Sequence, residues 1–435
     1  MTNIEHASST VRTSSSRVPR TIRIRLYALV FLVALLVRAG WGVYRLARCD
    51  DPAALEFPDE AQYWQMAASL RAGDGLQDEL GFRATRMPLY PAMLSLFAGT
   101  VHGVVAAKCF LWVLGSVLAV CSAAMAVALA GSRAGWIAGF LVAFDPFLVF
   151  FSSLLLTETV FLPIIVVLWW AARPLLMSVP GGGGAFRWVG VGLLAALAVY
   201  VRESSLGLAG ALVGFILVCR RFNRRSLAGA MLVAAMVVLA LAPWALRNRR
   251  VTGHWCWLTY RGGISLYDGV GPQADGSSNL REIKQMPAVR GLGEAEWNHY
   301  FMRESLRAIR GDPGRVLRLA GRKLARMWNP VPNVDTYQSR LARFVSAAWT
   351  LPLFALAVAG VASLLNTRGR DGLRLVAFLL LPALYLSALH SLFVGSVRYR
   401  LGAVPFLEIL AAVAIVAMFD RLRQGPAERD QTRGN

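Results

Sequence analysis

The chain has 435 residues, of which 56% are hydrophobic and 16% charged, and it carries a net charge of +21; its mean hydropathy is +0.50. These values exclude an ordinary soluble protein and indicate a chain that crosses a membrane several times. The excess of Lys and Arg would suggest nucleic acid as the partner of a soluble protein, but arginines that flank membrane spans explain it better, so we expect membrane lipids and no nucleic acid as partners.

Apolar runs recur along the chain, and a span needs about 20 apolar residues, or fewer where a helix is buried among others. The runs lie near 24–44, 103–130, 134–151, 157–172, 188–201, 204–219, 226–246, 343–365, 373–390 and 401–419. We therefore expect an all-α polytopic membrane protein of about ten transmembrane helices. The Ser- and Arg-rich tail 1–23 is predicted to be disordered, and the first run to be an uncleaved span because no Ala-x-Ala site follows it.

The arginines of the short loops predict the orientation, since such residues favour the cytoplasmic side. If the N-terminus is inside, the inside loops hold Arg133, Arg173, Arg187, Arg220, Arg221, Arg224, Arg225, Arg368, Arg370, Arg374, Arg421 and Arg423. The predicted parts are a membrane domain 24–246 with a first outer loop 45–102, an outer cap 247–342, C-terminal helices 343–420 and a cytoplasmic tail 421–435. We expect the protein in the cytoplasmic membrane, with its site on the outer face.

The outer cap is predicted to contain two helices, near Glu294–Arg310 and Pro313–Trp328.

Cysteine and histidine give no sign of a metal cluster. The cysteines are Cys49, Cys109, Cys121, Cys219 and Cys256, and they form no CxxC pair. Cys49 and Cys256 would both lie outside the membrane, where a bridge between them stays open. The histidines His254, His299 and His390 lack ligand spacing. The sequence therefore predicts no metal-binding residues and no certain cofactor, while a requirement for a divalent metal stays open.

The first outer loop carries acids that could do chemistry. Proline at the first helical position and acids in the first turn, as in Pro58-Asp59-Glu60, predict a helix that runs to about Leu70. This ordinary helix start explains the acids without any function. Alternatively, Asp59 and Tyr63 share one helix face four residues apart, and would present a carboxylate and a phenol to one pocket. Asp59 and Glu60 are our candidate catalytic residues, with Tyr63 lining the cavity.

The same loop also contains a pair of arginines. Arg83 and Arg86 are three residues apart and precede Pro88 and Tyr90. Guanidinium groups suit phosphate because they donate bidentate, charge-assisted hydrogen bonds. The pair is therefore a candidate site for the phosphate of a lipid-linked substrate, with Tyr90 in the cavity wall. The other interpretation is contact with lipid head groups at the membrane interface.

Charged residues at the outer ends of other spans add to this face. Glu158 opens one span and Asp145 ends the one before it; acids at membrane depth are costly and are candidates for function. Glu158 could instead cap its own helix, and Asp145 could break one. Arg398 and Arg400 precede the last span and bring cations to the same level. We expect these four residues to lie near the first outer loop.

These segments resemble the GT-C superfamily of integral-membrane glycosyltransferases, and within it the dolichyl-phosphate-mannose protein mannosyltransferase/aminoarabinose transferase type. The matching motifs are Asp59-Glu60-x-x-Tyr63, Arg83/Arg86-x-Pro88, Thr157-Glu158, Pro243-Trp244-x-x-Arg247-Asn248 and Arg398-Tyr399-Arg400 followed by Pro405-Phe406. The resemblance covers roughly residues 24–420, although each motif is short.

The resemblance implies a role for each matching residue. Asp59 falls on the family's catalytic base, Arg86 on the basic residue that holds the lipid phosphate, and Glu158 on an acid that lines the same cavity. Arg83, Arg398 and Arg400 would be further phosphate ligands. This chain has arginine where relatives often have lysine, which puts the acceptor class in doubt more than the donor class.

The expected function is transfer of a sugar from a polyprenyl-phosphate donor to an envelope acceptor (a lipid, glycan or protein), with inversion at the sugar carbon. One alternative is a transporter or flippase of a lipid-linked sugar, whose polar residues should lie at mid-span in broken or repeated helices. Another is a non-catalytic protein of envelope-polymer assembly. Replacement of the base, Asp59→Asn, should stop transfer and leave binding intact, which separates the three.

Overall fold

The computed structural model describes residues 20–176, 184–278 and 280–423; most of the predicted tail 1–23 and of the tail 421–435 lies outside these ranges. The described residues form helices and no strands. The bundle contains α1 (Arg20–Leu46), α4 (Gly103–Phe144), α5 (Pro146–Phe151), α6 (Glu158–Leu176), α7 (Ala185–Val201), α8 (Ser205–Cys219), α9 (Arg224–Thr252), α14 (Arg340–Leu392), α15 (Val397–Arg400) and α16 (Val404–Arg423).

The spans agree closely with the predicted ones. Within the described part of the chain, five helices, α1, α4, α6, α9 and α14, are long and apolar enough to cross a membrane, and α7 and α8 are shorter apolar helices. Two of the long helices are each two limbs, because Gly131 (φ 83°) and Gly369 (φ 49°) leave the helical conformation. With α16, these limbs account for the predicted ten spans. The all-α polytopic membrane fold is therefore confirmed.

One predicted span is made of two helices. The run 134–151 is divided at Asp145, where the sequence left a helix break open: α4 ends at Phe144 and α5 begins at Pro146. The side chain of Asp145 accepts a hydrogen bond from the Leu148 backbone N–H at 2.8 Å, and so caps the new helix. Its other oxygen accepts from Trp349 Nε1 at 2.9 Å, so both carboxylate oxygens bond within the bundle, and its place in the cavity wall stays a prediction.

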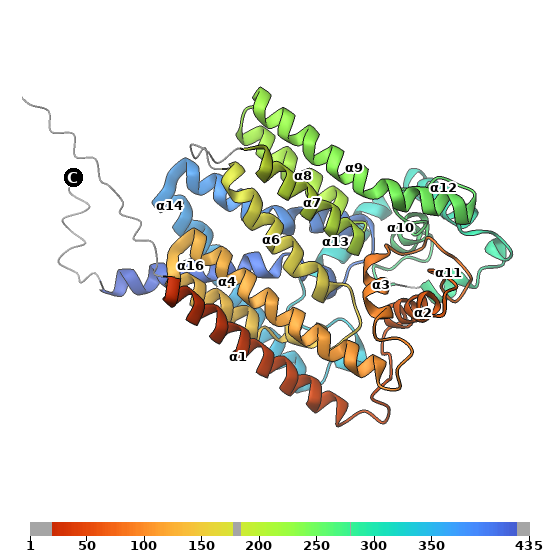
Figure 1. Cartoon of the computed structure of the whole chain (residues 1–435), viewed down its shortest axis with the longest axis horizontal. Coiled ribbons are helices and arrows are strands. Elements are labelled where there is room, and N and C mark those ends of the chain that lie inside the picture. The colour runs from red at the N-terminus through yellow and green to blue at the C-terminus, as the bar shows by residue number, and fades with distance from the viewer. Residues whose placement is uncertain (1–19, 177–183, 279, 424–435) are drawn as a thin grey trace, which may run out of the picture.

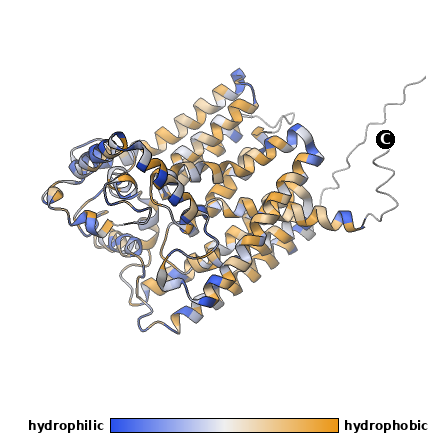
Figure 2. Ribbon diagram, turned by 180° about the vertical axis from the view of Figure 1, so that it is seen from behind, coloured by the Kyte–Doolittle hydropathy of each residue, from blue (hydrophilic) through white to orange (hydrophobic). Residues whose placement is uncertain are grey.

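The first eleven residues of α16 are all buried. α1 lies along α4, while α16 contacts both α4 and α14, and α7 packs between α6 and α9 (Figure 1). Large apolar side chains remain exposed on the outer faces of α1, α9 and α14, as expected for helices that contact lipid. Figure 2 shows hydrophobic residues along the bundle and hydrophilic residues gathered at the end that carries the loops.

Both outer segments fold together at that end (Figure 1). The first contributes α2 (Pro58–Ala72) and α3 (Leu89–Ser95), and the second α10 (Gly262–Val270), α11 (Leu280–Lys284), α12 (Glu294–Gly311) and α13 (Pro313–Met327), with 3-10 turns at Pro287–Val289 and Asp335–Tyr337. The predicted helices of the outer cap are confirmed within two residues. The Tyr260 backbone N–H donates to Ala84 O at 2.9 Å, and Glu294 accepts from the Arg83 and Ala84 backbone at 3.0 and 2.8 Å.

Candidate active site

Local sequence places Asp59 at the start of α2. Phe57 is extended, Pro58 opens the helix, and the Glu60 side chain reaches back to accept from the Phe57 backbone N–H at 2.9 Å. These features fix the first turn, since proline cannot donate there and the acid satisfies a donor that the helix leaves free. Asp59 therefore projects from a rigid turn, and its side chain keeps 23% of its exposure.

Three arginines from distant segments meet at the Asp59 carboxylate. Arg86 Nη2 donates to Oδ1, Arg261 Nη2 lies 3.5 Å from Oδ1, and Arg398 Nη1 donates to Oδ2 at 2.7 Å. Burial tends to raise the pKa of Asp59, but the charges of Arg86, Arg398 and Arg261 outweigh it and hold this pKa well below its usual value. Asp59 is therefore ionised at neutral pH.

Arg398 joins this carboxylate to a second one. Its Nε donates to Glu158 Oε1 at 2.6 Å and its Nη2 to Oε2 at 3.2 Å, a bidentate pair. Arg202 Nη1 also donates to Glu158 Oε1, at 3.0 Å. Four guanidinium groups thus pair with only two carboxylates, those of Asp59 and Glu158. The site therefore carries excess positive charge. The four arginines are Arg86, Arg202, Arg261 and Arg398.

Arg86 is held by neutral partners as well. Its Nε donates to Gln62 Oε1 at 2.8 Å, and its Nη1 to Tyr63 Oη at 3.1 Å. Burial raises the pKa of Tyr63, so the phenol stays neutral. Gln62 and Tyr63 both come from α2, one turn after Asp59, as helical spacing requires. The structure thus brings together four of the predicted residues: Asp59, Tyr63, Arg86 and Arg398, with Glu158 bonded through the last.

Other predicted residues lie outside this cluster. Glu60 is fully buried, and its oxygens accept from the backbone N–H groups of Glu56, Phe57 and Leu155, at 2.9, 2.9 and 2.7 Å. We therefore assign Glu60 a structural role in fixing the loop, and not a role in proton transfer. Tyr90 is fully buried behind Tyr63, with the ring centroids 4.9 Å apart, and so does not line an open cavity.

Arg83 and Arg400 make their described contacts outside this cluster, and phosphate binding by either stays a prediction. The Arg83 side chain is exposed. Its backbone carbonyl accepts a hydrogen bond from Arg247 Nη1 at 2.5 Å. Arg400 is 1% exposed, donates to the Asn329 carbonyl, and stacks 4.5 Å above the Phe147 ring. It points into the bundle because side chains two residues apart on a helix project about 200° apart.

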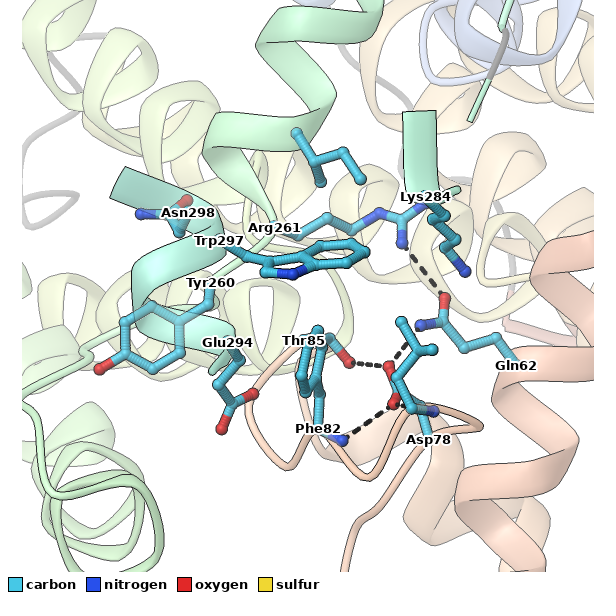
Figure 3. Close-up of a pocket in the computed structure, with 12 residues that line it drawn as sticks. Gln62, Asp78, Phe82, Thr85, Tyr260, Arg261, Lys284, Glu294, Trp297 and Asn298 are labelled. Atoms are coloured by element: carbon cyan, nitrogen blue, oxygen red, sulfur yellow. Dashed lines mark hydrogen bonds between the residues drawn. The ribbon is translucent and has the colours of Figure 1, made fainter. Parts of the chain in front are cut away.

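A cavity lies beside the arginine cluster, between the first outer loop and the outer cap. It encloses about 380 Å³ including its open mouth. Its walls include Asp78, Phe82, Arg261, Trp297 and Asn298 (Figure 3).

Among residues 20–176, 184–278 and 280–423, no group of three or more His, Cys, Asp or Glu side chains is arranged to hold a metal ion. The five cysteines are free, so Cys49 and Cys256 are not bridged.

No protein-family model and no curated protein matches the chain. Solved structures do match. The archaeal oligosaccharyltransferase AglB from Archaeoglobus fulgidus, in complex with an inhibitory peptide and a dolichol-phosphate, has a TM-score of 0.59 at 14% identity over 95% of this chain and 52% of that one. ArnT from Cupriavidus metallidurans, bound to undecaprenyl phosphate, has a TM-score of 0.52 at 14% identity over 91% and 59%. Both are GT-C glycosyltransferases. The chain has the GT-C fold. It spans about half the length of the solved structures it matches.

Within this GT-C fold, Arg261 is a site residue that the sequence did not indicate. It lies in Tyr260-Arg261-Gly262-Gly263, just before α10. Gly263 is required there because an added Cβ would lie 2.2 Å from the Asn298 carbonyl oxygen. An arginine followed by two glycines is a weak signal by itself, and its importance depends on the contact between two distant loops.

Proposed function

We propose that the chain is a glycosyltransferase that moves a sugar from a polyprenyl-phosphate donor to an envelope acceptor at the outer face of the cytoplasmic membrane. The observation that carries the proposal is the meeting of Arg86, Arg261 and Arg398 on the Asp59 carboxylate. The GT-C fold supports it, and so do the lipid phosphates bound to its solved neighbours. The excess positive charge of the cluster suits a lipid-linked phosphate.

The leaving group explains the need for arginine. When the bond between the anomeric carbon and the phosphate oxygen breaks, its electron pair stays on the phosphate, which gains negative charge. Cations placed in advance stabilise that charge, and the lipid phosphate needs no general acid. Arg86 and Arg398 are suited to this task because Arg86 is buried, Arg398 is only partly exposed, and both are already oriented by neutral or acidic partners.

The acceptor hydroxyl would react through Asp59. Its oxygen bonds to the anomeric carbon from the side opposite the phosphate, which inverts that carbon, and its proton passes to the Asp59 carboxylate. One carboxylate is enough, in contrast to the acid and base pair of a glycosidase. With three arginines upon it, Asp59 is ionised but only weakly basic. A donor phosphate that shares Arg86 and Arg398 would weaken those pairs and make Asp59 a stronger base.

The test replaces Arg86 and uses Arg83 as its matched control. Loss of a charge-assisted contact in Arg86→Ala should weaken donor binding by about 2–3 kcal/mol, whereas exposed Arg83→Ala should have little effect. Arg86→Lys should retain part of the activity, because the charge survives and the fork geometry does not. The measurements are undecaprenyl-phosphate binding and sugar transfer by purified variants. Equal activity of Arg86→Ala and the wild type would place the phosphate elsewhere.

A further inference from the structure

Gln62 and Arg261 line the cavity between the loops and also contact the arginine cluster around Asp59. Gln62 Nε2 donates to Asp78 Oδ2 at 3.0 Å, while Arg261 Nη1 donates to Gln62 Oε1 at 3.2 Å (Figure 3). Arg261 also pairs with Asp59. Arg398 pairs with the other carboxylate oxygen of Asp59 and does not line the cavity. Glu158, the second partner of Arg398, does not line it either. An occupant would therefore approach Asp59 from another side than a phosphate bound at Arg398.

The floor of the cavity is fixed before anything binds. Asp78 accepts hydrogen bonds at 3.0 Å from Gln62, from the Thr85 hydroxyl and from the backbone N–H groups of Leu80 and Phe82 (Figure 3). Its capacity is therefore spent on shaping the loop. Glu294 ties the same loop to α12 through its Oε2 atom. A site held in this way binds without having to order its own walls.

Polar groups of the other wall retain hydrogen-bonding capacity. The bonds described for Glu294 involve Oε2 and leave Oε1 available, and Asn298 accepts from the Gly263 N–H through Oδ1 at 2.8 Å, which leaves its Nδ2 donors. Lys284 donates once, to exposed Glu79 at 2.6 Å, and has three donors. The cavity thus offers an acceptor and donors of both charged and neutral type.

Aromatic rings supply the apolar part. Trp297 gives its indole N–H to the Val289 carbonyl at 2.7 Å, so the ring itself is what it offers to the cavity. Phe82 packs edge to face against it, with centroids 5.3 Å apart and planes at 79°. A sugar ring combines an apolar C–H face with neighbouring hydroxyls that both donate and accept, and it complements such a wall.

We propose that this cavity binds the acceptor, and that the acceptor presents a sugar ring whose hydroxyl is glycosylated. The inference deepens the proposed function and rests on it. Its lining combines aromatic faces with hydrogen-bonding groups, the two kinds of contact that a sugar ring makes. An acyl chain would require a pocket that is apolar throughout, whereas here Leu80, Phe82, Ile264 and Trp297 alternate with charged and amide groups. An extended peptide that paired as a strand would require a row of unpaired backbone groups, but the Arg83, Ala84 and Tyr260 backbone N–H groups here are already bonded.

The experiment measures binding without the donor. The full chain in lipid nanodiscs is titrated with a panel of methyl glycosides and with a serine- and threonine-containing peptide, and binding is followed by saturation-transfer NMR. Asn298→Asp keeps the acceptor for the Gly263 N–H and loses both amide donors, and Lys284→Met removes a partly exposed ammonium. Each should weaken glycoside binding about 5- to 10-fold, as expected for one hydrogen bond. Arg303→Gln, on the exposed face of α12, is the control and should change nothing.

A second pair of measurements separates this inference from the proposed function. Arg398→Ala should weaken undecaprenyl-phosphate binding and leave glycoside affinity within about twofold, while Asn298→Asp should do the reverse, because separated sites act independently. Failure of the first arm alone would overturn the donor site and leave the sugar site standing. The sugar site is overturned if no glycoside binds, if the peptide binds in place of glycosides, or if Asn298→Asp and Lys284→Met bind glycosides as the wild type does.

Discussion

Arg398 contacts both acids of the candidate site, and this makes the electrostatics of the two inseparable. Its guanidinium pairs with Glu158 on one edge and with Asp59 on the other. A buried acid with such partners remains ionised at a cost in basicity, and a buried arginine with such partners remains oriented before the substrate arrives. The residues are thus arranged for an anion to enter between them and redistribute the hydrogen bonds.

Asp59→Asn should abolish most of the sugar transfer. The amide keeps the size of the carboxylate and some of its hydrogen bonds but cannot accept the hydroxyl proton, so the rate should fall about 10²- to 10⁴-fold. Undecaprenyl-phosphate binding should be retained or strengthened, because Arg86 and Arg398 lose a competing anion. The measurement is transfer and lipid binding by purified protein. A variant that transfers sugar at the wild-type rate would leave the transporter and assembly alternatives standing.

The pH dependence should differ between the free enzyme and the donor complex. Because the three arginines hold the pKa of Asp59 well below its usual value, kcat/KM should show no acid limb from Asp59 above about pH 4. In the complex, phosphate shares those arginines, so the pKa rises and the acid limb of kcat should move to higher pH. Rate profiles against pH for each constant test this, and coincident acid limbs would contradict it.

Acid unfolding caused by Asp59 should not contribute to the acid limb of kcat. An acid whose folded-state pKa is depressed contributes stability above its unfolded pKa, and loses it only as the pH falls through the lower folded value. Asp59 should therefore cause no change in Tm between about pH 5 and 8, a range in which thermal unfolding of the wild type serves as the control.

At the scale of elements, short segments decide which predicted residues reach the site. α15 is four residues long, and it directs Arg398 toward Asp59 and Arg400 toward Asn329. The sequence could place both arginines at one membrane level from their distance to the last span. It could not tell them apart, because the direction of each side chain depends on how α15 meets the helices around it.

Glu60→Gln should act on stability and leave the chemistry largely intact. The Glu60 oxygens bond to three backbone N–H groups, and through Leu155 they tie α2 to the turn before α6. An amide nitrogen facing one of those N–H groups would leave it unsatisfied, at about 1–3 kcal/mol. We expect a lower Tm and a kcat close to that of the wild type at low temperature.

The chain offers a matched control for this prediction. Glu296 accepts from the Gly293 backbone N–H at 2.9 Å in the same kind of helix start, but it is exposed. Water can replace that bond, so Glu296→Gln should change Tm much less. Unequal losses of kcat, with a larger loss in Glu60→Gln than in Asp59→Asn, would return the base to Glu60.

For the whole molecule, the sequence predicted the bundle well because each span is a local property. Apolar length, arginine in short loops, and proline or glycine at helix ends need no knowledge of tertiary contacts. Arg261 and Trp297 were not predicted as site residues, because they reach the site only when residues 247–342 fold onto the first outer loop. Such contacts join segments about 200 residues apart, as between Arg261 and Asp59, and short-range patterns carry no trace of them.

The same arginine pattern predicts on which side of the membrane this site lies. Cys49, in the first outer loop, is exposed, whereas the other four cysteines are intermediate or buried. In intact cells permeabilised only at the outer envelope, a membrane-impermeant maleimide should therefore label Cys49, and the Cys49→Ser variant should lose that label. In the Cys49→Ser background, His299→Cys at an exposed position of α12 should also be labelled from outside. Arg224→Cys, at the start of α9, should react only in inside-out vesicles. If His299→Cys were labelled only from the cytoplasmic side, the topology and the outer location of the site would both be wrong, because the cap and Asp59 lie at the same end of the bundle (Figure 1).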